Sequence, residues 1–402
     1  MKRTKCYFIT GGGYGNKGAE SMLFTLIEEL RRKDPDCKIT AQVTFDDTID
    51  EKKKIYDFDL IDDNFSHLEK LRNNQGFFKK LEYKFSKKYP FLNALLSSDA
   101  VFDVSGFSIS SDKSFKTNYR VFYKIELAKA YNKKIILMPQ SIGPVDYNGK
   151  YGITNEYLKK VLSYPEIIFC RENDGYNLLK NLGLKNIIKS NDMVLENPNA
   201  LTGNGIFKIT PSNKKTISIP SKSVLIIPNK RLFERCKNRD YYKVYENIIS
   251  YLLKKNYNIV ISHYDNYDIE LCRELKNLFK DNNKVILEEN DLNCIEYSEI
   301  LDKFEFLILS RFHSIVHSYR KYAPVLILGW AVKYNELAQN LNQEKFLFDC
   351  RNDFNINDIY KSIDYLIDRN KEVKETIKNH VLEIQKHNCY DIIRNKLNNE
   401  HK

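Results

Sequence analysis

Short apolar runs alternate with amphipathic helical patterns along almost the whole chain, and this alternation constrains the fold more than any other feature. In the first half, runs with the length and composition of buried strands fall at Cys6–Thr10, Lys38–Thr44, Ala100–Val104, Lys134–Met138, Ile167–Cys170 and Asn186–Lys189. In the second half they fall at Ser223–Ile227, Ile259–Ser262, Lys284–Leu287, Phe304–Leu309, Pro324–Leu328 and Phe346–Phe348. Strands that alternate with crossover helices form parallel sheets, so the sequence predicts an α/β protein.

The helical patterns between these runs are amphipathic. In Glu20–Arg32, the apolar residues repeat with the period of a helix that buries one face. In the second half, helices are expected at Tyr241–Lys255, Asp268–Phe279, Ile295–Asp302, His313–Tyr322, Lys333–Leu341, Asn357–Arg369 and Glu372–His387. The charged and aromatic segment Asp50–Tyr89 is expected to hold one or two surface helices.

A polar stretch rich in proline and glycine, Asn197–Lys222, interrupts the alternation near the middle of the 402 residues. We therefore predict an N-terminal α/β domain over residues 1–200, a linker over 201–222 and a C-terminal α/β domain over 223–402. Two doubly wound, Rossmann-like domains with a cleft between them form a GT-B-like arrangement. In such a chain, the final helix near Glu372–His387 is expected to return to the first domain.

The net charge is +11, with a pI near 9.0. This charge fits a solvated lysine-rich surface, an anionic substrate or an anionic membrane surface. Nucleic acid is not expected, because the basic residues are spread along the chain and no DNA- or RNA-binding motif appears. The apolar run after the basic N-terminus is too short for a signal peptide, and no run has the length of a spanning helix. The eight cysteines form no C-x-x-C pair, which indicates reduced thiols. We expect a soluble cytoplasmic protein that can also rest on the inner membrane surface.

The most informative motif is Arg311-Phe312-His313, which stands between a predicted strand and a predicted helix. Ligands of open α/β sheets bind at the carboxyl ends of the strands, and a helix N-terminus there adds free N–H groups. Arg311 and His313 therefore predict a site for a small anion that carries phosphate or carboxylate. Arg171 follows another strand and Lys333 precedes the next helix, so each is a further candidate ligand of that anion. A surface Arg–Glu pair and an exposed lysine are the alternatives for these two.

A glycine-rich loop, Thr10 to Glu20, contains Gly13, Gly15 and Gly18 between a strand and a helix. The spacing matches the dinucleotide-binding G-x-G-x-x-G, but the acidic residues that follow lie too far along the chain for a full match. Contact of the loop with another substrate and simple packing are the alternatives. Gly13, Asn16 and Glu20 are the candidate ligands here.

Polar residues end two further strands of the first half. Gln140 and Ser141 follow the run Lys134–Met138 in a Pro-Gln-Ser-Ile-Gly-Pro turn, and a purely structural turn would not need this Gln-Ser pair. Asp103 ends the run Ala100–Val104 and either faces the cleft or belongs to a turn. His313 and His317 share a helical face, but Ser314 replaces the glutamate of H-E-x-x-H, so no metal site is predicted.

Taken together, these motifs resemble those of the polysaccharide pyruvyl transferase family. The motifs, in order, are Asn16 with Gly18-Ala19-Glu20, Pro139-Gln140-Ser141-Ile142-Gly143-Pro144, Arg171-Glu172, Arg311-Phe312-His313 and Lys333-Tyr334. They span most of the chain and are specific as a set.

The resemblance implies an enzyme that transfers a pyruvyl group from phosphoenolpyruvate to sugar hydroxyls as a ketal. The acceptor would be a cell-surface polysaccharide, such as capsule or exopolysaccharide, or its lipid-linked oligosaccharide precursor, bound on the N-terminal side. Arg171, Arg311 and Lys333 would then bind the donor, and His313 would act as the general acid. Glu20 or Asp103 would be the base. No cofactor is expected besides the donor substrate.

Two other classes of protein remain open at this point. One is a GT-B glycosyltransferase with a nucleotide-sugar donor, because fold does not fix function. The other is a non-catalytic glycan-binding member of the family. The presence of Arg171, Arg311 and His313 together argues against a protein that has lost its activity.

Overall fold

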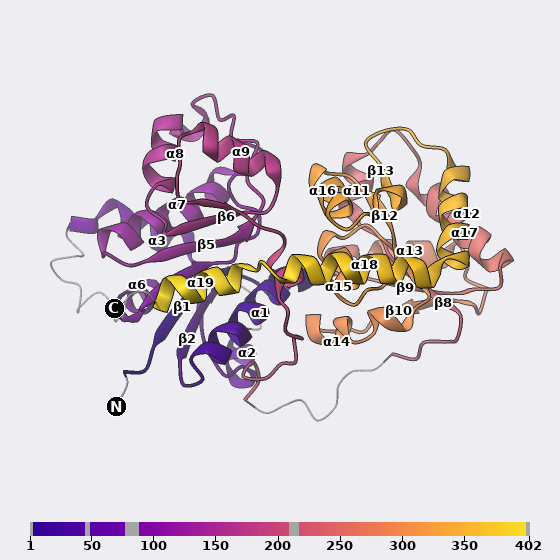
Figure 1. The fold of residues 1–402 in the computed structure, drawn as a ribbon, viewed down its shortest axis with the longest axis horizontal. Helices are drawn as coiled ribbons and strands as arrows, with labels where there is room; N and C mark the ends of the chain where they lie inside the picture. The colour runs from indigo at the N-terminus through magenta and orange to yellow at the C-terminus, as the bar shows by residue number, and fades with distance from the viewer. Residues whose placement is uncertain (1–2, 45–48, 77–87, 209–216, 399–402) are drawn as a thin grey trace.

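The computed structural model describes residues 3–44, 49–76, 88–208 and 217–398. It contains two parallel β-sheets, each in its own α/β domain (Figure 1). The first sheet has seven strands in the order β3-β2-β1-β4-β5-β6-β7, and the second has six in the order β10-β9-β8-β11-β12-β13. In both sheets the strand order reverses beside the first strand, which is the pattern of a doubly wound fold. The predicted fold of two Rossmann-like domains is thus confirmed.

In the first domain, β1, the strand that precedes the glycine-rich loop, lies inside the sheet with strands on both sides. Its strands are β1 (Cys6–Gly12), β2 (Lys38–Val43), β3 (Asp59–Asp62), β4 (Ala100–Asp103), β5 (Ile135–Gln140), β6 (Ile167–Cys170) and β7 (Ile187–Lys189). Its helices are α1 (Lys17–Lys33), α2 (Ile49–Ile55), α3 (Phe65–Asn73), α6 (Pro90–Ser97), α7 (Phe115–Ala130), α8 (Asn155–Leu162), α9 (Asn173–Asn181) and α10 (Met193–Glu196). The central strands are fully buried because helices cover both faces of the sheet.

The second domain repeats this plan. Its strands are β8 (Ser223–Ile227), β9 (Asn258–Ser262), β10 (Val285–Glu288), β11 (Phe306–Leu309), β12 (Val325–Gly329) and β13 (Leu347–Asp349). Its helices are α11 (Lys230–Arg235), α12 (Tyr241–Lys254), α13 (Ile269–Asn277), α14 (Cys294–Ser298), α15 (Phe312–Arg320), α16 (Val332–Asn340), α17 (Ile356–Asp368) and α18 (Asn370–Gln385). The strands and helices predicted in this half lie within a few residues of these bounds.

Several elements of the first domain were missed by the sequence analysis, among them β3 and α7. Strand β3 lies at the edge of its sheet, and of its four residues only Leu60 is fully buried, so it lacks an apolar run. Helix α7 was missed because lysine, arginine and glutamate interrupt its apolar pattern. Lys124 of this helix is nevertheless buried, with its ammonium group 3.8 Å from Asp103 and 3.9 Å from Asp63.

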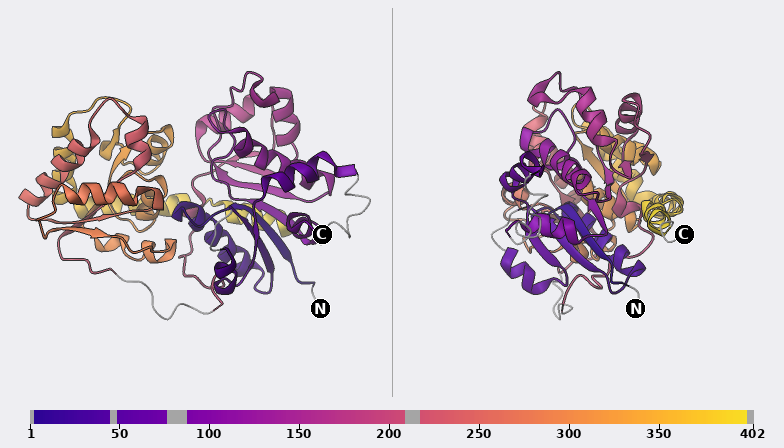
Figure 2. Two further views of the ribbon diagram at one scale, coloured as in Figure 1. Left: turned by 180° about the vertical axis from the view of Figure 1, so that it is seen from behind. Right: turned by 90° about the vertical axis from the view of Figure 1, so that its left-hand side faces the viewer.

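The chain leaves the first domain late and returns to it at the end. Residues 199–208 still pack on the first domain, where the Glu28 carboxylate accepts hydrogen bonds from the backbone N–H groups of Thr202 and Gly203. At the other end, α18 contacts α10 and α15, and a further helix, α19 (Cys389–Asn398), lies along the first domain (Figures 1 and 2). There the hydroxyl of Tyr390 donates to the carbonyl of Met193, 2.9 Å away. The helix expected near Glu372–His387 is α18, which thus reaches the first domain through α10, and α19 continues along that domain.

Candidate functional site

The carboxyl ends of strands from both sheets meet where the two domains touch. The loop after β1 reaches the loop after β9, where the Asn16 side chain donates to Asp265 at 2.9 Å. The loop after β6 reaches the start of α15, where the guanidinium of Arg171 lies 4.7 Å from the centre of the Phe312 ring. This position is where doubly wound folds bind ligands.

His313 lies in the first turn of α15, directly against the first domain. Its Nε2 atom is 3.5 Å from a carboxylate oxygen of Asp192, at the N-terminus of α10. Burial, together with the positive charges of Arg171 and Lys333, holds the pKa of His313 well below its usual value. The imidazole is therefore neutral near pH 7 in the unliganded protein, and an anion beside it would raise its pKa.

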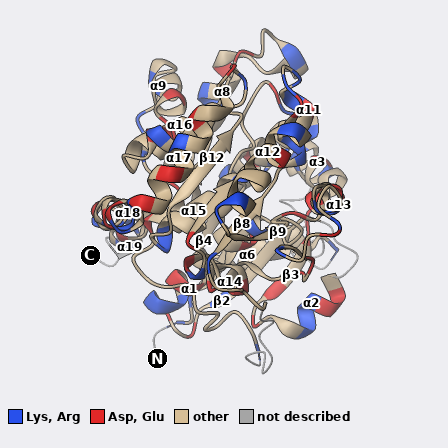
Figure 3. Ribbon diagram, turned by 90° about the vertical axis from the view of Figure 1, so that its right-hand side faces the viewer, with Lys and Arg blue, Asp and Glu red and all other residues tan. Residues whose placement is uncertain are grey.

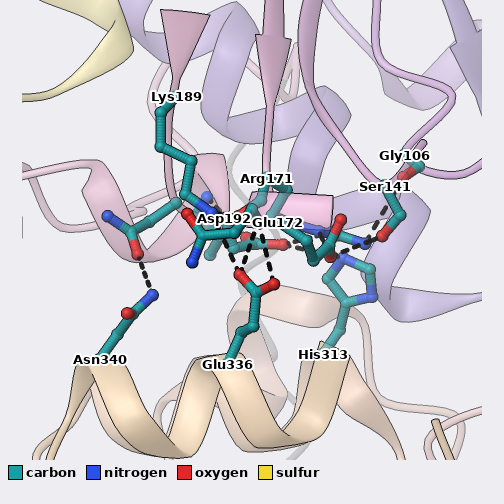
Figure 4. Close-up of polar contacts among 12 residues, drawn as sticks. Gly106, Ser141, Arg171, Glu172, Lys189, Asp192, His313, Glu336 and Asn340 are labelled. Atoms are coloured by element: carbon teal, nitrogen blue, oxygen red, sulfur yellow. Dashed lines mark hydrogen bonds and ion pairs between the residues drawn. The ribbon is translucent and has the colours of Figure 1, made fainter. Parts of the chain in front are cut away.

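Arg171 is buried at the end of β6 among carboxylates (Figure 4). It pairs with Asp192 at 2.8 Å and with Glu172 at 3.1 Å, and it donates to the Ser141 hydroxyl at 2.6 Å. Burial opposes its charge, but these two carboxylates outweigh that effect and raise the pKa of Arg171. Arg171 is thus a fixed cation whose hydrogen bonds hold the turn after β5 in place.

Lys333 lies at the start of α16, with its ammonium group 4.8 Å from the Phe312 ring centre. Burial and then the charge of Arg171 lower the pKa of Lys333 to about 7, although Glu172 opposes them. Arg171, His313 and Lys333, which are far apart in sequence, therefore surround one aromatic ring, Phe312. We call these four residues the Phe312 cluster.

Arg311 points away from the Phe312 cluster. It binds Asp268 through two hydrogen bonds of 2.5 and 2.7 Å, and its Nη1 atom lies 3.3 Å from Asp265. Because Asp265 also accepts from Asn16, Arg311 belongs to a network that joins the domains. Four residues were predicted to meet at the site of the donor substrate. The structure brings three of them together, whereas the fourth, Arg311, is paired with Asp268 and Asp265 instead.

The two predicted base candidates lie in different surroundings. Glu20 is buried in the domain interface, where it accepts from the backbone N–H of Cys294 at 2.8 Å, and burial raises its pKa to about 7. Asp103 is buried at the end of β4 and accepts from the Thr10 hydroxyl at 2.8 Å. Neither lines the cavity described below, and the role of base stays a prediction for both.

Gln140 and Ser141 lie at the end of β5, as predicted. Ser141 connects Arg171 to Glu172, because its hydroxyl accepts from the first and donates to the second at 2.7 Å. Gln140 is fully buried, yet neither atom of its amide has a hydrogen-bond partner among the described residues. A buried amide without partners is available to a ligand or a water molecule.

A cavity of about 670 Å³ opens at the carboxyl ends of β1 to β4, beside the glycine-rich loop. Gly13 and Asn16 line it, as do polar side chains from the loops after β2, β3 and β4 and from α7. These are Thr44, Asp63, Ser105, Ser108, Thr117, Arg120 and Lys124. The volume and the polar lining fit a ligand with many hydroxyl groups, such as a sugar.

The sequence analysis missed Asp192 and Glu336. Asp192 lies in the short loop after β7, so a search for charged residues near strand ends, which selected Arg171, could also have found it. Glu336 accepts two hydrogen bonds of 2.9 Å from the backbone N–H of Asn173 and pairs with Lys189 at 3.1 Å across the domain interface (Figure 4). No sequence pattern marks Glu336, because its partners belong to the other domain.

The fold is shared with solved structures of very different sequence. A UDP-GlcNAc 2-epimerase from Neisseria meningitidis, bound to UDP-GlcNAc, has a TM-score of 0.62 at 13% identity over 98% of this chain and 99% of that one. The epimerase from Methanocaldococcus jannaschii has a TM-score of 0.58 at 13% identity, covering 90% and 93% of the two chains. A glycosyltransferase from Rickettsia africae has a TM-score of 0.55 at 14% identity, covering 98% and 97%. At such identities the likeness shows the fold alone, which is GT-B.

The particular family follows from the sequence. A comparison with curated protein sequences gives no match. The family model described as polysaccharide pyruvyl transferase matches residues 16–331, which is most of the chain. The matched range includes three members of the Phe312 cluster, and the fourth, Lys333, lies two residues beyond it. The chain belongs to the polysaccharide pyruvyl transferase family, and the predicted resemblance is confirmed.

Proposed function

We propose that this protein transfers the pyruvyl group of phosphoenolpyruvate to two hydroxyls of a sugar, giving a cyclic ketal and inorganic phosphate. The observation that carries the proposal is the Phe312 cluster. Arg171, His313 and Lys333 meet there at the contact between the two domains, in a chain of the pyruvyl transferase family. Phosphoenolpyruvate carries a phosphate and a carboxylate, so two cations and a proton donor match its chemistry.

The reaction needs one proton delivered to carbon. Protonation of the donor's methylene carbon gives an oxocarbenium-like centre, which one sugar hydroxyl attacks. The second hydroxyl then displaces phosphate by cleavage of the C–O bond to it. Of the two hydroxyl protons, one passes to the base and the other to the leaving phosphate. We assign the proton donor to His313. An anionic donor beside it would raise the pKa of His313 from its low value in the free protein and charge the ring for this step.

The sugar acceptor is assigned to the cavity beside the glycine-rich loop. Gly18, in the first turn of α1, touches His313, so this loop reaches the Phe312 cluster. The Asp63 carboxylate lines the cavity and lies 3.1 Å from Nε of Arg120. A carboxylate beside an arginine is suited to bind sugar hydroxyls. Asp63 therefore joins Glu20 and Asp103 as a candidate base.

A lipid-linked acceptor would bring the protein to a membrane surface. No helix in the described part of the chain has both the length and the apolar character needed to cross a bilayer. The net charge of +11 favours contact with an anionic leaflet. We therefore include peripheral membrane contact in the proposal.

The proposal is tested by incubating the protein with phosphoenolpyruvate and a panel of nitrophenyl and lipid-linked sugars while phosphate release is followed. The rival donor, a nucleotide sugar, has support from the fold, because solved structures with this fold bind UDP-GlcNAc and UDP. Thermal stabilisation by phosphoenolpyruvate compared with UDP separates the two donors, because a ligand stabilises the protein that binds it.

A further inference from the structure

Charged side chains of both signs are mixed along the outer helices of the protein. In Figure 3, lysine and arginine segments alternate with aspartate and glutamate segments on α13 and α18. Lys124 of α7 differs from these, because its side chain is only 2% exposed and lines the cavity beside the glycine-rich loop. Burying a charge costs free energy unless the charge is paired and hydrogen-bonded, so the contacts of Lys124 indicate what the residue is for.

Two carboxylates share the ammonium group of Lys124. Its Nζ atom lies 3.9 Å from an oxygen of Asp63 and 3.8 Å from an oxygen of Asp103. At these distances the carboxylates balance the positive charge, but neither accepts a hydrogen bond. Nowhere in the described part of the chain does this ammonium group have a hydrogen-bond acceptor. Lys124 therefore brings N–H donors without partners to a cavity of about 670 Å³.

Asp103 is already occupied by other residues. One of its oxygens accepts from the Thr10 hydroxyl at 2.8 Å, and the other accepts from the backbone N–H of Ser105 at 3.1 Å. Its side chain is buried, and it does not line the cavity. Asp103 therefore fixes the position of Lys124 and balances its charge, but it does not reach a ligand in the cavity.

Asp63, by contrast, lines the cavity beside Lys124. One of its oxygens accepts from the Gln42 side-chain amide at 3.2 Å, and the other lies 3.1 Å from Nε of Arg120. The two cations, Arg120 and Lys124, are thus matched by two carboxylates, and this wall of the cavity carries no net charge. A ligand here gains hydrogen bonds to fixed donors and acceptors, whereas an anion would gain no net attraction and would face the Asp63 carboxylate.

We propose that Lys124 and Asp63 together bind the two acceptor hydroxyls that become the ketal, and that the acceptor is an uncharged sugar. This inference rests on the proposed function for the identity of the two hydroxyls. Lys124 donates to the hydroxyl oxygens and makes their protons more acidic, and Asp63 accepts a hydrogen bond from a hydroxyl. A ketal carbon joins two oxygens of one sugar, so both hydroxyls lie close enough to share one ammonium group. Among the three candidate bases, Asp63 is then the one in contact with the acceptor.

The test measures dissociation constants by calorimetry, first for nitrophenyl glycosides without phosphoenolpyruvate and then for phosphoenolpyruvate alone. Galactoside, glucoside and mannoside are the uncharged probes, and glucuronide is the charged counterpart of the glucoside. Lys124→Met and Asp63→Asn each remove one of the two ligands, and Lys116→Met, on an exposed lysine of the same helix, is the matched control. The double variant of Lys124→Met with Asp103→Asn keeps the charges balanced if Lys124→Met alone does not fold, which thermal midpoints show.

We expect the Lys124 and Asp63 variants to weaken binding of the uncharged sugar about tenfold or more, while phosphoenolpyruvate binding stays as in the wild type. The control should change neither. The wild type should bind the glucoside more tightly than the glucuronide, a comparison that needs no variant.

The outcomes separate this inference from the proposed function. If the wild type forms a ketal but the folded Lys124 and Asp63 variants bind sugar as tightly as it does, the inference is wrong and the proposed function stands. If the wild type binds an uncharged sugar through Lys124 and forms no ketal, the sugar site stands and the proposed function is wrong. Tighter binding of the glucuronide than of the glucoside, or no binding of any glycoside by the wild type, would overturn the inference.

Discussion

Gly18 and His313 touch across the contact between the two domains. A Cβ atom added at Gly18 would come within 2.3 Å of Nδ1 and 2.8 Å of Cβ of His313, closer than non-bonded atoms approach. Residue 18, the second residue of α1, must therefore be glycine if His313 is to keep its position. This contact couples the glycine-rich loop of the first domain to the proton donor proposed on the second.

Gly18→Ala should displace His313 or separate the domains locally. Because misplacement of a catalytic group by about 1 Å can slow a reaction about 10²-fold, we expect a loss of turnover of that size. Steady-state kinetics with phosphoenolpyruvate and a sugar acceptor checks this. Gly76→Ala is the matched control, since nothing lies within 4 Å of a Cβ at Gly76 and this residue does not line the cavity. Equal loss in both variants would contradict the Gly18–His313 coupling.

His313→Ala should lower turnover by about 10²–10⁴-fold, because it removes the proposed proton donor. Phosphoenolpyruvate affinity should change much less, since Arg171 and Lys333 remain. Single-turnover kinetics together with calorimetry of donor binding separates these two effects. Wild-type turnover in His313→Ala would show that another group delivers the proton.

Arg311→Ala should first of all destabilise the protein. It leaves Asp268, whose side chain is fully buried, without the arginine that binds it through two hydrogen bonds. Breaking a buried pair in this way costs about 3–5 kcal/mol of unfolding free energy. Urea unfolding measures this value, with Arg273→Ala, on an exposed pair of α13, as the control. The prediction would be wrong if Arg311→Ala weakened phosphoenolpyruvate binding without any loss of stability. In that case Arg311 would bind the donor substrate, and its pairing with Asp268 would not contribute to the stability of the fold.

Much of the fold followed from the sequence, whereas the site followed only in part. The strands of the second domain were predicted well because each is a continuous apolar run buried on both faces. The proximity of Arg171, His313 and Lys333 was predicted because strand ends in a parallel sheet lie at one edge. The carboxylates Asp192 and Asp268, which decide how Arg171 and Arg311 are oriented, were not found. Such pairs join elements that are distant in sequence, and no local pattern records them.

Glu20→Gln should stabilise the protein above neutral pH. Burial raises the pKa of Glu20 to about 7, so the folded state holds a proton that the unfolded state releases at lower pH. The stability that this carboxyl contributes is present below its ordinary pKa and is lost as the pH rises through about 7. At pH 8, the glutamine variant should therefore exceed the wild type in unfolding free energy by up to about 3 kcal/mol.

Urea unfolding at pH 5 and pH 8 measures the effect of Glu20→Gln. Glu156→Gln, at an exposed position of α8, is the control and should leave the difference between the two pH values unchanged. If Glu20→Gln lowers stability at pH 8, then the charged carboxylate strengthens the contact with Cys294 and its burial is not the dominant effect.

The most direct test of the proposed function is the reaction itself, run with purified protein, phosphoenolpyruvate and a panel of sugar acceptors. Phosphate release and the mass and NMR spectra of the sugar product are followed together. We predict phosphate release matched by equal formation of a pyruvyl ketal, and loss of both in His313→Ala. Release of a nucleoside diphosphate from a nucleotide sugar, with no phosphate released from phosphoenolpyruvate on any acceptor, would contradict the proposal.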